Sequence, residues 1–290
     1  MRKRGLAFSI SIPKALRILV ISSCGPSDLY LVREVAARFP ICGIIRPVAT
    51  HGRRLNWKNF LKHPLKLLNG AANQRISAYR SRKTNAWVSR NLFSESAPEL
   101  PENVIDIPNT AINSPTTVAR ISALAPDLIL ACGAPVLAPE IFNIPRLASI
   151  NIHFGIAPNY RGEHTLLWPL RIGDYQNIGI TIHHIDEGID TGRPLVRGYP
   201  SLETFDTEKS IVLKCIRMAP RILIPVLENM VNTGSAPLIK PVETAREGIF
   251  IRYQDRKLSH DFTFNIRRYI GHVRPPDQSE RIEKLYLQDF

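Results

Sequence analysis

Cysteine is scarce in this 290-residue chain, and long hydrophobic runs are absent. The four cysteines have no spacing typical of a metal or redox site, so the sequence predicts free, buried thiols in a reducing cytoplasm. No apolar run approaches the roughly 20 residues that a membrane-spanning helix needs. The N-terminus is basic, but its first apolar stretch is short and is broken at Pro13 and Lys14. We therefore expect no cleaved signal peptide and a cytoplasmic protein.

Negative charge is absent from residues 35–94, although the whole chain carries 25 acidic residues. The same stretch holds most of the excess positive charge behind the net charge of +13. Its basic residues are Arg38, Arg46, Arg53, Arg54, Lys58, Lys62, Lys66, Arg75, Arg80, Arg82, Lys83 and Arg90. Such a segment attracts phosphates, nucleic acid or an anionic membrane surface. The alternative is a solvated basic face with no specific ligand.

Short apolar runs alternate with helical patterns along most of the chain. Residues 16–22 and 41–45 predict buried strands, and residues 29–39 between them predict a helix that Ser27 or Asp28 could cap. This strand–helix–strand opening predicts a mostly parallel sheet with helices on both faces. Further strands are expected at residues 104–107, 127–132, 148–153, 178–185 and 195–199, and helices at 116–124 and from 139.

Two regions depart from this alternation. Residues 53–93 are basic, with apolar residues at helical spacing, and predict a helical insertion. Residues 204–232 predict a long helix with interruptions at Pro220 and Pro225. Beyond it we expect a hairpin at 248–253 and 257–260 and a short helix near 265–269. The chain is therefore divided into a main domain at residues 14–200 and a C-terminal helix and appendage at 201–290.

Three polar residues follow predicted strands of the main domain. Asn151 and His153 are two apart on one strand, so their side chains share a face. Both lie at the carboxyl end of that strand, where ligands bind in open parallel sheets. Asp190 stands in a tight loop between Gly188 and Gly192. We expect these three side chains to form the reacting core.

An amide, an imidazole and a carboxylate suit acyl transfer without a covalent enzyme intermediate. An Asn N–H can bind a developing oxyanion, a His can share that role or carry a proton, and an Asp can orient the imidazole. No Ser or Cys accompanies them as a nucleophile, which favours direct attack of an amine on a carbonyl. Each residue also has a structural alternative in a strand, turn or loop. A metal site of His153, His183 or His184 with Asp190 stays open, although no compact metal motif is present.

A longer ordered pattern surrounds these residues. It comprises Asn151-Ile-His153, Pro158-Asn-Tyr-Arg161-Gly162, Gly173-Asp174, Gly179-Ile-Thr181-Ile-His183 and Asp186-Glu-Gly188-Ile-Asp190-Thr-Gly192. In order and spacing this pattern resembles the N10-formyltetrahydrofolate-dependent formyltransferases, which act on methionyl-tRNA, glycinamide ribonucleotide or amino sugars. The resemblance covers residues 16–22 and about 104–199 and implies a Rossmann-like fold.

The resemblance also implies roles for individual residues. Asn151 and His153 would stabilise the oxyanion of the formyl group, and Asp190 would assist proton transfer. Arg161 and Gly162 would contact the acceptor. The formyl donor would be 10-formyltetrahydrofolate, and no metal is expected. The residues implied to hold the pterin ring of the donor are Ala134, Val136, Leu137, Ile185, Asp186 and Glu187.

Departures from the family pattern bear on the acceptor. Residues 154–158 read Phe-Gly-Ile-Ala-Pro where many members have Pro-Ser-Leu-Leu-Pro. Asp28 at a helix start would repel the phosphate of glycinamide ribonucleotide, and the tail carries little of the strand pattern of the tRNA enzyme's C-terminal barrel. The motif residues between Asn151 and Gly162 most resemble those of family members that act on small amines. They favour a small phosphorylated amine as the acceptor, such as an amino sugar nucleotide. The alternatives are a methionyl-tRNA enzyme that binds tRNA through residues 35–94, a glycinamide ribonucleotide enzyme, a formyltetrahydrofolate hydrolase and a non-catalytic binding module. The sequence leaves the oligomeric state open.

Overall fold

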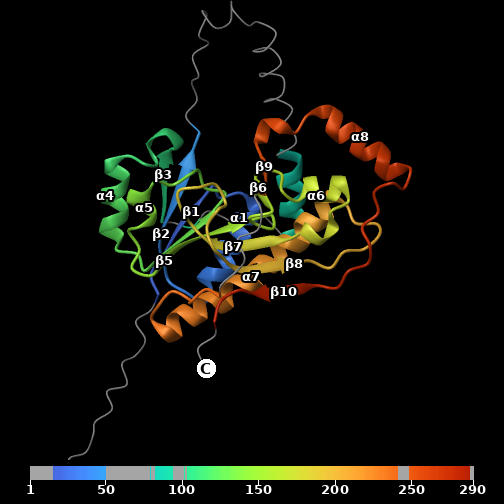
Figure 1. Ribbon diagram of the computed structural model, residues 1–290. Helices are drawn as coiled ribbons and strands as arrows, with labels where there is room; N and C mark the ends of the chain where they lie inside the picture. Colours follow the sequence, from blue (N-terminus) through green and yellow to red (C-terminus); the bar gives the residue numbers. More distant parts are fainter. Residues whose placement is uncertain are drawn as a thin grey trace, which may run out of the picture.

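A large sheet forms the centre of the molecule (Figure 1). The computed structural model describes residues 16–49, 79, 82–93, 101, 103–240 and 248–287. Within them the sheet has eight strands in the order β10-β8-β7-β5-β4-β1-β2-β3. These strands are β1 (Ile18–Ser22), β2 (Ile41–Val48), β3 (Val104–Pro108), β4 (Leu128–Cys132), β5 (Ala148–His153), β7 (Ile180–His184), β8 (Pro194–Tyr199) and β10 (Arg281–Lys284).

The strand order reverses next to β1. The chain runs from β1 outward through β2 to β3, and then returns to β4 on the other side of β1. The strands from β3 to β5 are parallel, whereas β7, β8 and β10 are antiparallel additions. Reversal of strand order leaves a crevice at the carboxyl ends of the two central strands. The fold therefore provides a place for a ligand where β1 and β4 end. This agrees with the prediction of a mostly parallel sheet that binds ligands at the carboxyl ends of its strands.

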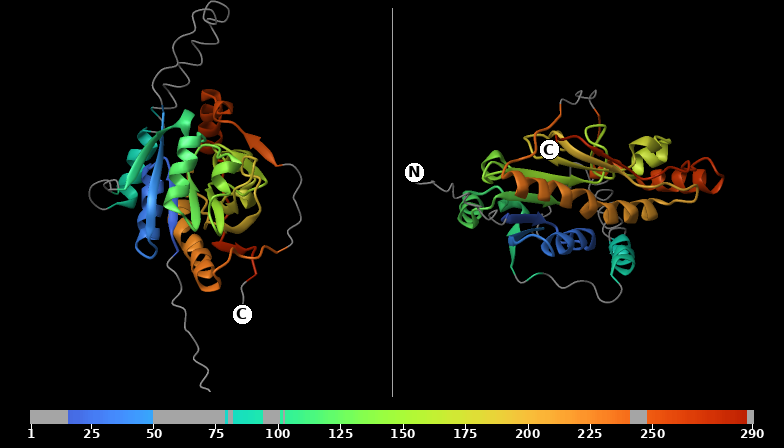
Figure 2. Two further views of the ribbon diagram at one scale, coloured as in Figure 1. Left: turned by 90° about the vertical axis from the view of Figure 1, so that its left-hand side faces the viewer. Right: turned by 90° about the horizontal axis from the view of Figure 1, so that it is seen from below.

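Helices cover both faces of the sheet (Figure 2). Successive residues of β1 point to opposite faces, and Ile18 and Val20 belong to one apolar cluster while Leu19 and Ile21 belong to another. The first cluster lies against α1 and α7, and the second against α4 and α5. The helices are α1 (Pro26–Ala36), α4 (Pro115–Leu124), α5 (Pro139–Phe142), α6 (Leu167–Ile172), α7 (Glu208–Thr233) and α8 (Leu258–Tyr269), with short 3-10 turns η1 (Asn109–Ala111), η2 (Tyr175–Asn177) and η3 (Tyr253–Asp255).

The stretch after residue 200 takes a larger part in the fold than a C-terminal appendage implies. Helix α7 lies along one face of the sheet and buries a continuous apolar side (Figure 2). Strand β10 pairs with β8 at the edge of the main sheet. Strand β9 (Ile249–Ile251) pairs in parallel with β6 (Tyr160–Gly162) in a second, two-stranded sheet. Strands β9 and β10 of this stretch therefore complete both sheets.

Several local predictions differ from the structure. Helix α7 continues through Pro220 and Pro225, because burial of its apolar face outweighs the cost of prolines within a helix. Gly25 rather than Ser27 or Asp28 is the N-cap of α1. The predicted hairpin is absent from the described residues, because β9 pairs with β6 and residues 258–260 begin α8.

Other predictions concern the thiols, the membrane and the insertion. The four cysteines are unpaired; Cys132 and Cys215 are buried, and Cys24 and Cys42 are half-buried. Across the described ranges, no helix is long and apolar enough to cross a membrane. Residues 82–92 are helical, in agreement with a helical insertion, while residues 53–78 lie outside the described part of the chain.

Packing of α7 on the sheet generates a stability prediction. Leu223 has no exposed surface, so Leu223→Ala leaves a cavity and is expected to lower the free energy of unfolding by about 2–5 kcal/mol. Leu238 is 65% exposed, and the matched variant Leu238→Ala should change it by less than about 0.5 kcal/mol. Urea unfolding followed by circular dichroism measures both. Equal values for the two variants would contradict the placement of α7.

Candidate active site

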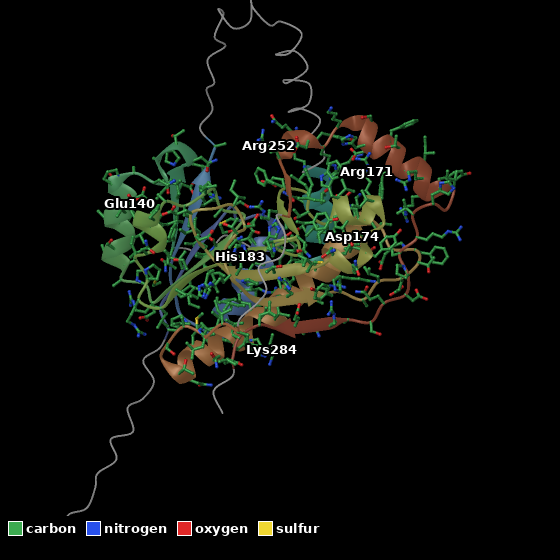
Figure 3. The ribbon with its side chains drawn as sticks, viewed as in Figure 1. Glu140, Arg171, Asp174, His183, Arg252 and Lys284 are labelled. Carbon is green, nitrogen blue, oxygen red and sulfur yellow. The ribbon has the colours of Figure 1, made fainter. Side chains whose placement is uncertain are left out.

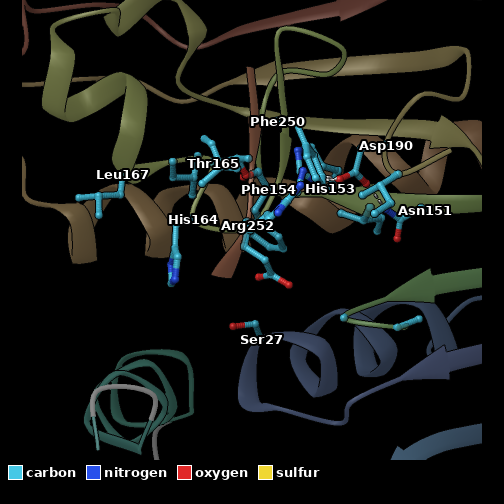
Figure 4. A pocket seen from close by; sticks show the side chains of 18 of the residues that line it. Ser27, Asn151, His153, Phe154, His164, Thr165, Leu167, Asp190, Phe250 and Arg252 are labelled. Atoms are coloured by element: carbon cyan, nitrogen blue, oxygen red, sulfur yellow. Dashed lines mark hydrogen bonds and ion pairs between the residues drawn. The ribbon is translucent and has the colours of Figure 1, made fainter. Parts of the chain in front are cut away.

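Asn151, His153 and Asp190 come together at the carboxyl end of β5. This strand lies between β4 and β7, so the two side chains on its common face project from the middle of the sheet. Asp190 is carried over them by the loop that joins β7 to β8, and it adopts a left-handed backbone conformation with φ 51°. Figure 4 shows Asp190 beside His153 and Asn151. The structure therefore assembles the three residues that the sequence singled out.

The Asp190 carboxylate contacts groups from three segments. Its Oδ2 lies 3.3 Å from Nδ1 of His153 and accepts a 2.9 Å hydrogen bond from the backbone N–H of Gly162. Its Oδ1 accepts a 3.3 Å hydrogen bond from Nδ2 of Asn151 and lies 3.4 Å from Nε2 of His183. Strand β5, strand β7 and the β6 segment thus meet at one side chain.

The tautomer of each histidine follows from its other ring nitrogen. Nε2 of His153 lies 2.9 Å from the carbonyl oxygen of Tyr160, and Nδ1 of His183 lies 2.7 Å from the carbonyl oxygen of His184. A carbonyl oxygen only accepts, so these nitrogens carry the protons. Nδ1 of a neutral His153 is then a lone pair facing Asp190. It is the position that can take up a second proton, which the carboxylate would stabilise.

His183 completes the arrangement, although the sequence placed it only in the motif and in the metal alternative. Its unprotonated Nε2 accepts a hydrogen bond from Nδ2 of Asn151 at 3.2 Å. Nε2 of His183 and Oδ1 of Asp190 are neighbours on one side of the Asn151 amide. One amide N–H can be shared between them, which leaves the second N–H for a ligand oxygen. His183 lies near the centre of the molecule in Figure 3.

The predicted acceptor-contacting segment holds the trio in place. Gly162 has φ +89°, and a side chain there would collide with the carbonyl of Ile251 in β9, so glycine permits both the pairing and the hydrogen bond to Asp190. The Tyr160 hydroxyl donates to Asp174 at 2.7 Å. Burial and this hydrogen bond raise the pKa of Tyr160. The Gly173-Asp174 motif therefore positions the carbonyl that binds His153.

Burial and charge shift the titration of the site. Burial lowers the pKa of His153, against the opposing effect of Asp190. Burial would raise the pKa of Asp190, but the neighbouring His183 and His153 and the N–H of Gly162 bring it below its usual range. At neutral pH the site therefore holds an ionised carboxylate beside a neutral imidazole.

A cavity of about 700 Å³ opens over these residues (Figure 4). Of the residues predicted from the sequence, Asn151, His153, Asp190, Gly162, Ala134 and Val136 line it. Ser27 and Asp28 line it from the start of α1, and Ser27 lies across the space from His153 (Figure 4). The cavity thus spans the crevice between the ends of β1 and β4.

Five predicted residues lie outside the lining of this cavity. Leu137 is buried and Ile185 is half-buried in the apolar cluster on the α4 side of the sheet. Asp186 accepts hydrogen bonds from its own loop, Glu187 is exposed, and the Arg161 guanidinium lies 5.9 Å from the Phe250 ring centre. Their binding roles stay predictions. Within the described residues no group of three or more His, Cys, Asp or Glu is arranged to hold a metal ion.

Sequence reasoning missed the cavity residues supplied by the C-terminal stretch. Phe250, Ile251 and Arg252 reach the cavity because β9 pairs with β6, and Glu208 and Val212 reach it from α7. No motif in the sequence signals these positions, since they depend on pairing between strands almost ninety residues apart.

The lowered pKa of His153 predicts a pH effect on stability. In the unfolded chain this histidine takes up a proton below about pH 6.5, whereas the folded protein resists it, so stability should fall as the pH falls from about 6.5 to 5. In His153→Gln that part of the slope should disappear, by up to about 1.4 kcal/mol per pH unit. Urea unfolding across this range, with exposed His272→Gln as control, measures it. The titration of Asp190 changes the stability only at lower pH, because the pKa of this carboxyl lies below its usual range. Parallel profiles for wild type and His153→Gln would contradict the assignment.

Relatives of known structure share the fold. A sugar N-formyltransferase from a Shewanella species has a TM-score of 0.52 at 16% identity, covering 83% of this chain and 78% of that one. A 4-N formyltransferase from Francisella tularensis has a TM-score of 0.53 at 14% identity, covering 95% and 99%. A phosphoribosylglycinamide formyltransferase from Bacillus halodurans has a TM-score of 0.50 at 16% identity, covering 76% and 97%.

Sequence relatives fall in the same group. The methionyl-tRNA formyltransferase of Methylacidiphilum infernorum is 31% identical over 129 residues, which is 44% of this chain and 40% of that enzyme. The enzyme of Legionella pneumophila strain Corby is 28% identical over 174 residues, 59% and 55% of the two chains. The matches thus span less than two thirds of these relatives. The formyl transferase family model matches residues 73–227, more than half of the chain, which includes Asn151, His153 and Asp190. The chain belongs to the formyl transferase family.

Proposed function

We propose that this protein transfers a formyl group from 10-formyltetrahydrofolate to the primary amine of a small phosphorylated acceptor, such as an amino sugar nucleotide. The observation that carries the proposal is the contact of both Asn151 and His153 with Asp190 at the edge of a single cavity. Family membership supports the transferred group.

The cavity suits the donor. Val136 and Ile189 are 54% and 41% exposed although they are apolar, and both line the cavity. Apolar side chains left open at a concave site favour a ligand with a flat apolar body. Ala134 stands beside Val136 in the loop after β4. The donor supplies the formyl carbon and, as the leaving group, the N10 nitrogen of tetrahydrofolate.

The reacting residues divide the chemistry between them. Attack of a neutral amine on the formyl carbon forms the new C–N bond and places negative charge on the formyl oxygen. The free N–H of Asn151 would bind that oxygen. Nδ1 of His153 would take the proton that the amine loses, stabilised by Asp190, and return it to N10 as the bond from N10 to the formyl carbon breaks. No covalent bond to the protein is needed.

Substitution of the trio tests this mechanism. Asn151→Ala removes an oxyanion donor and is expected to lower kcat by roughly 10²–10³. Asp190→Ala should lower it at least as much, because His153 loses the carboxylate that stabilises its second proton. Release of tetrahydrofolate in the presence of amine acceptors measures kcat, and exposed Asn265→Ala is the control. Rates near wild type in both variants would remove these residues from the reaction. Full turnover without any amine would identify a hydrolase instead.

A second candidate is formylation of methionyl-tRNA. It is favoured by the relatives of 28–31% identity and by the basic segment 35–94, of which the described helix at 82–92 exposes Lys83 and Arg90. A protein that contacts several phosphates of tRNA loses affinity steeply as salt rises.

Salt dependence separates the two candidates. For tRNA, raising the salt from about 50 to 200 mM should weaken binding by roughly 10³-fold or more if six phosphates are contacted, and Lys83→Ala with Arg90→Ala should flatten the slope. For a small acceptor we expect no measurable tRNA affinity and activity that changes little with salt. Filter binding of tRNA gives the slope, and Arg120→Ala, outside this helix, is the control. Steep salt dependence would replace our proposal with the tRNA function.

A further inference from the structure

Glu163 and Arg252 lie side by side at the end of the two-stranded sheet. Gly162 of β6 is in register with Ile251 of β9, and the backbone N–H of Glu163 donates to the Ile251 carbonyl at 2.8 Å. Glu163 and Arg252 directly follow the last paired residues of the two strands, where neighbouring backbones are about 5 Å apart. Both side chains are exposed, and both line the cavity.

These two charges differ from the other charges of the cavity in having no partner among the residues that the structure describes. Asp28 accepts hydrogen bonds from Ser22 and Ser23, Asp190 is bound as described above, and Glu208 accepts two hydrogen bonds from the Arg256 guanidinium. Across the described residues, neither the Glu163 carboxylate nor the Arg252 guanidinium has a hydrogen bond or ion pair, including with the other. Two neighbouring opposite charges that do not neutralise each other can each bind a ligand group.

Their position fits the acceptor rather than the donor. Glu163 directly follows Gly162, whose N–H binds Asp190, so its carboxylate lies next to the reacting residues. Figure 4 shows Arg252 facing the same space as His153 and Ser27. The exposed apolar residues Val136 and Ile189 belong to other loops.

We propose that Glu163 and Arg252 form the recognition site for the acceptor, in which Glu163 binds the ammonium group and Arg252 binds a phosphate of the same molecule. A primary amine is protonated in neutral water. The Glu163 carboxylate binds the ammonium group and takes its extra proton, and the neutral amine that remains beside the trio can attack. A guanidinium binds phosphate through two parallel N–H donors. The inference rests on the proposed function. It predicts that the acceptor of the formyl group is a molecule in which a phosphate lies close to the amine.

Four matched sugars test the two halves of the site separately. Isothermal titration of the full chain with glucosamine 6-phosphate, glucose 6-phosphate, glucosamine and glucose gives the contribution of the phosphate and of the amine. Wild type should bind glucosamine 6-phosphate roughly 10-fold or more tightly than glucose 6-phosphate, which lacks the amine, and than glucosamine, which lacks the phosphate. Arg252→Ala should abolish the advantage of the phosphate and keep that of the amine, and Glu163→Gln should do the reverse. Arg252→Lys should restore part of the phosphate effect, and Arg120→Ala should match wild type.

The outcomes distinguish this inference from the proposed function. Equal affinity of wild type for all four sugars, or an unchanged phosphate effect in Arg252→Ala, would overturn the acceptor site. Loss of both effects in each variant would also overturn it, because it would show that the side chains do not act separately. Tetrahydrofolate is titrated into wild type in parallel. Failure of that binding alone would reject the proposed donor while leaving the acceptor site supported.

Discussion

The Asp190 carboxylate is the point at which the architecture of the site converges. Its two oxygens contact the side chains of Asn151, His153 and His183 and the backbone of Gly162. These groups belong to β5, β7 and the β6 segment, so one side chain fixes the relative position of two central strands and a loop. A carboxylate that is not exposed to bulk water needs several donors to remain ionised. The Asn151 amide and the Gly162 N–H are such donors, and they tie the loop of Asp190 to the end of the sheet.

The second sheet extends this arrangement to the wall of the cavity. Pairing of β6 with β9 places Gly162 against Ile251, and the same pairing sets Glu163 beside Arg252. The segment that binds Asp190 and the C-terminal stretch therefore share backbone hydrogen bonds. A chain segment with no family motif contributes to the cavity because it completes a strand pair that the motif segment starts.

Among the described residues, some charged side chains of the cavity have hydrogen-bond or ion-pair partners within the protein, and others have none. The Asp28 carboxylate accepts hydrogen bonds from two Ser hydroxyls, and the Glu208 carboxylate forms an ion pair with Arg256. The carboxylate of Asp190, to which we assign proton movement, and the Glu163 and Arg252 side chains, to which we assign acceptor binding, are the remaining charged groups that line the cavity in the described part of the chain. Such a division gives a cavity with several acids the capacity to take a ligand bearing both charges.

Local patterns in the sequence determined the alternating strands and helices, the parallel core of the sheet and the approach of Asn151 to His153. Those features follow from backbone periodicity and from the rule that parallel strands end at one edge. The order of the motifs likewise identified Asp190 and its family. Only the tertiary structure decided that β9 pairs with β6 rather than forming a hairpin, that α7 runs through two prolines, and that Arg252 reaches the cavity. These outcomes depend on which distant surfaces bury each other, and the free energy of such burial is not encoded in any local window of residues.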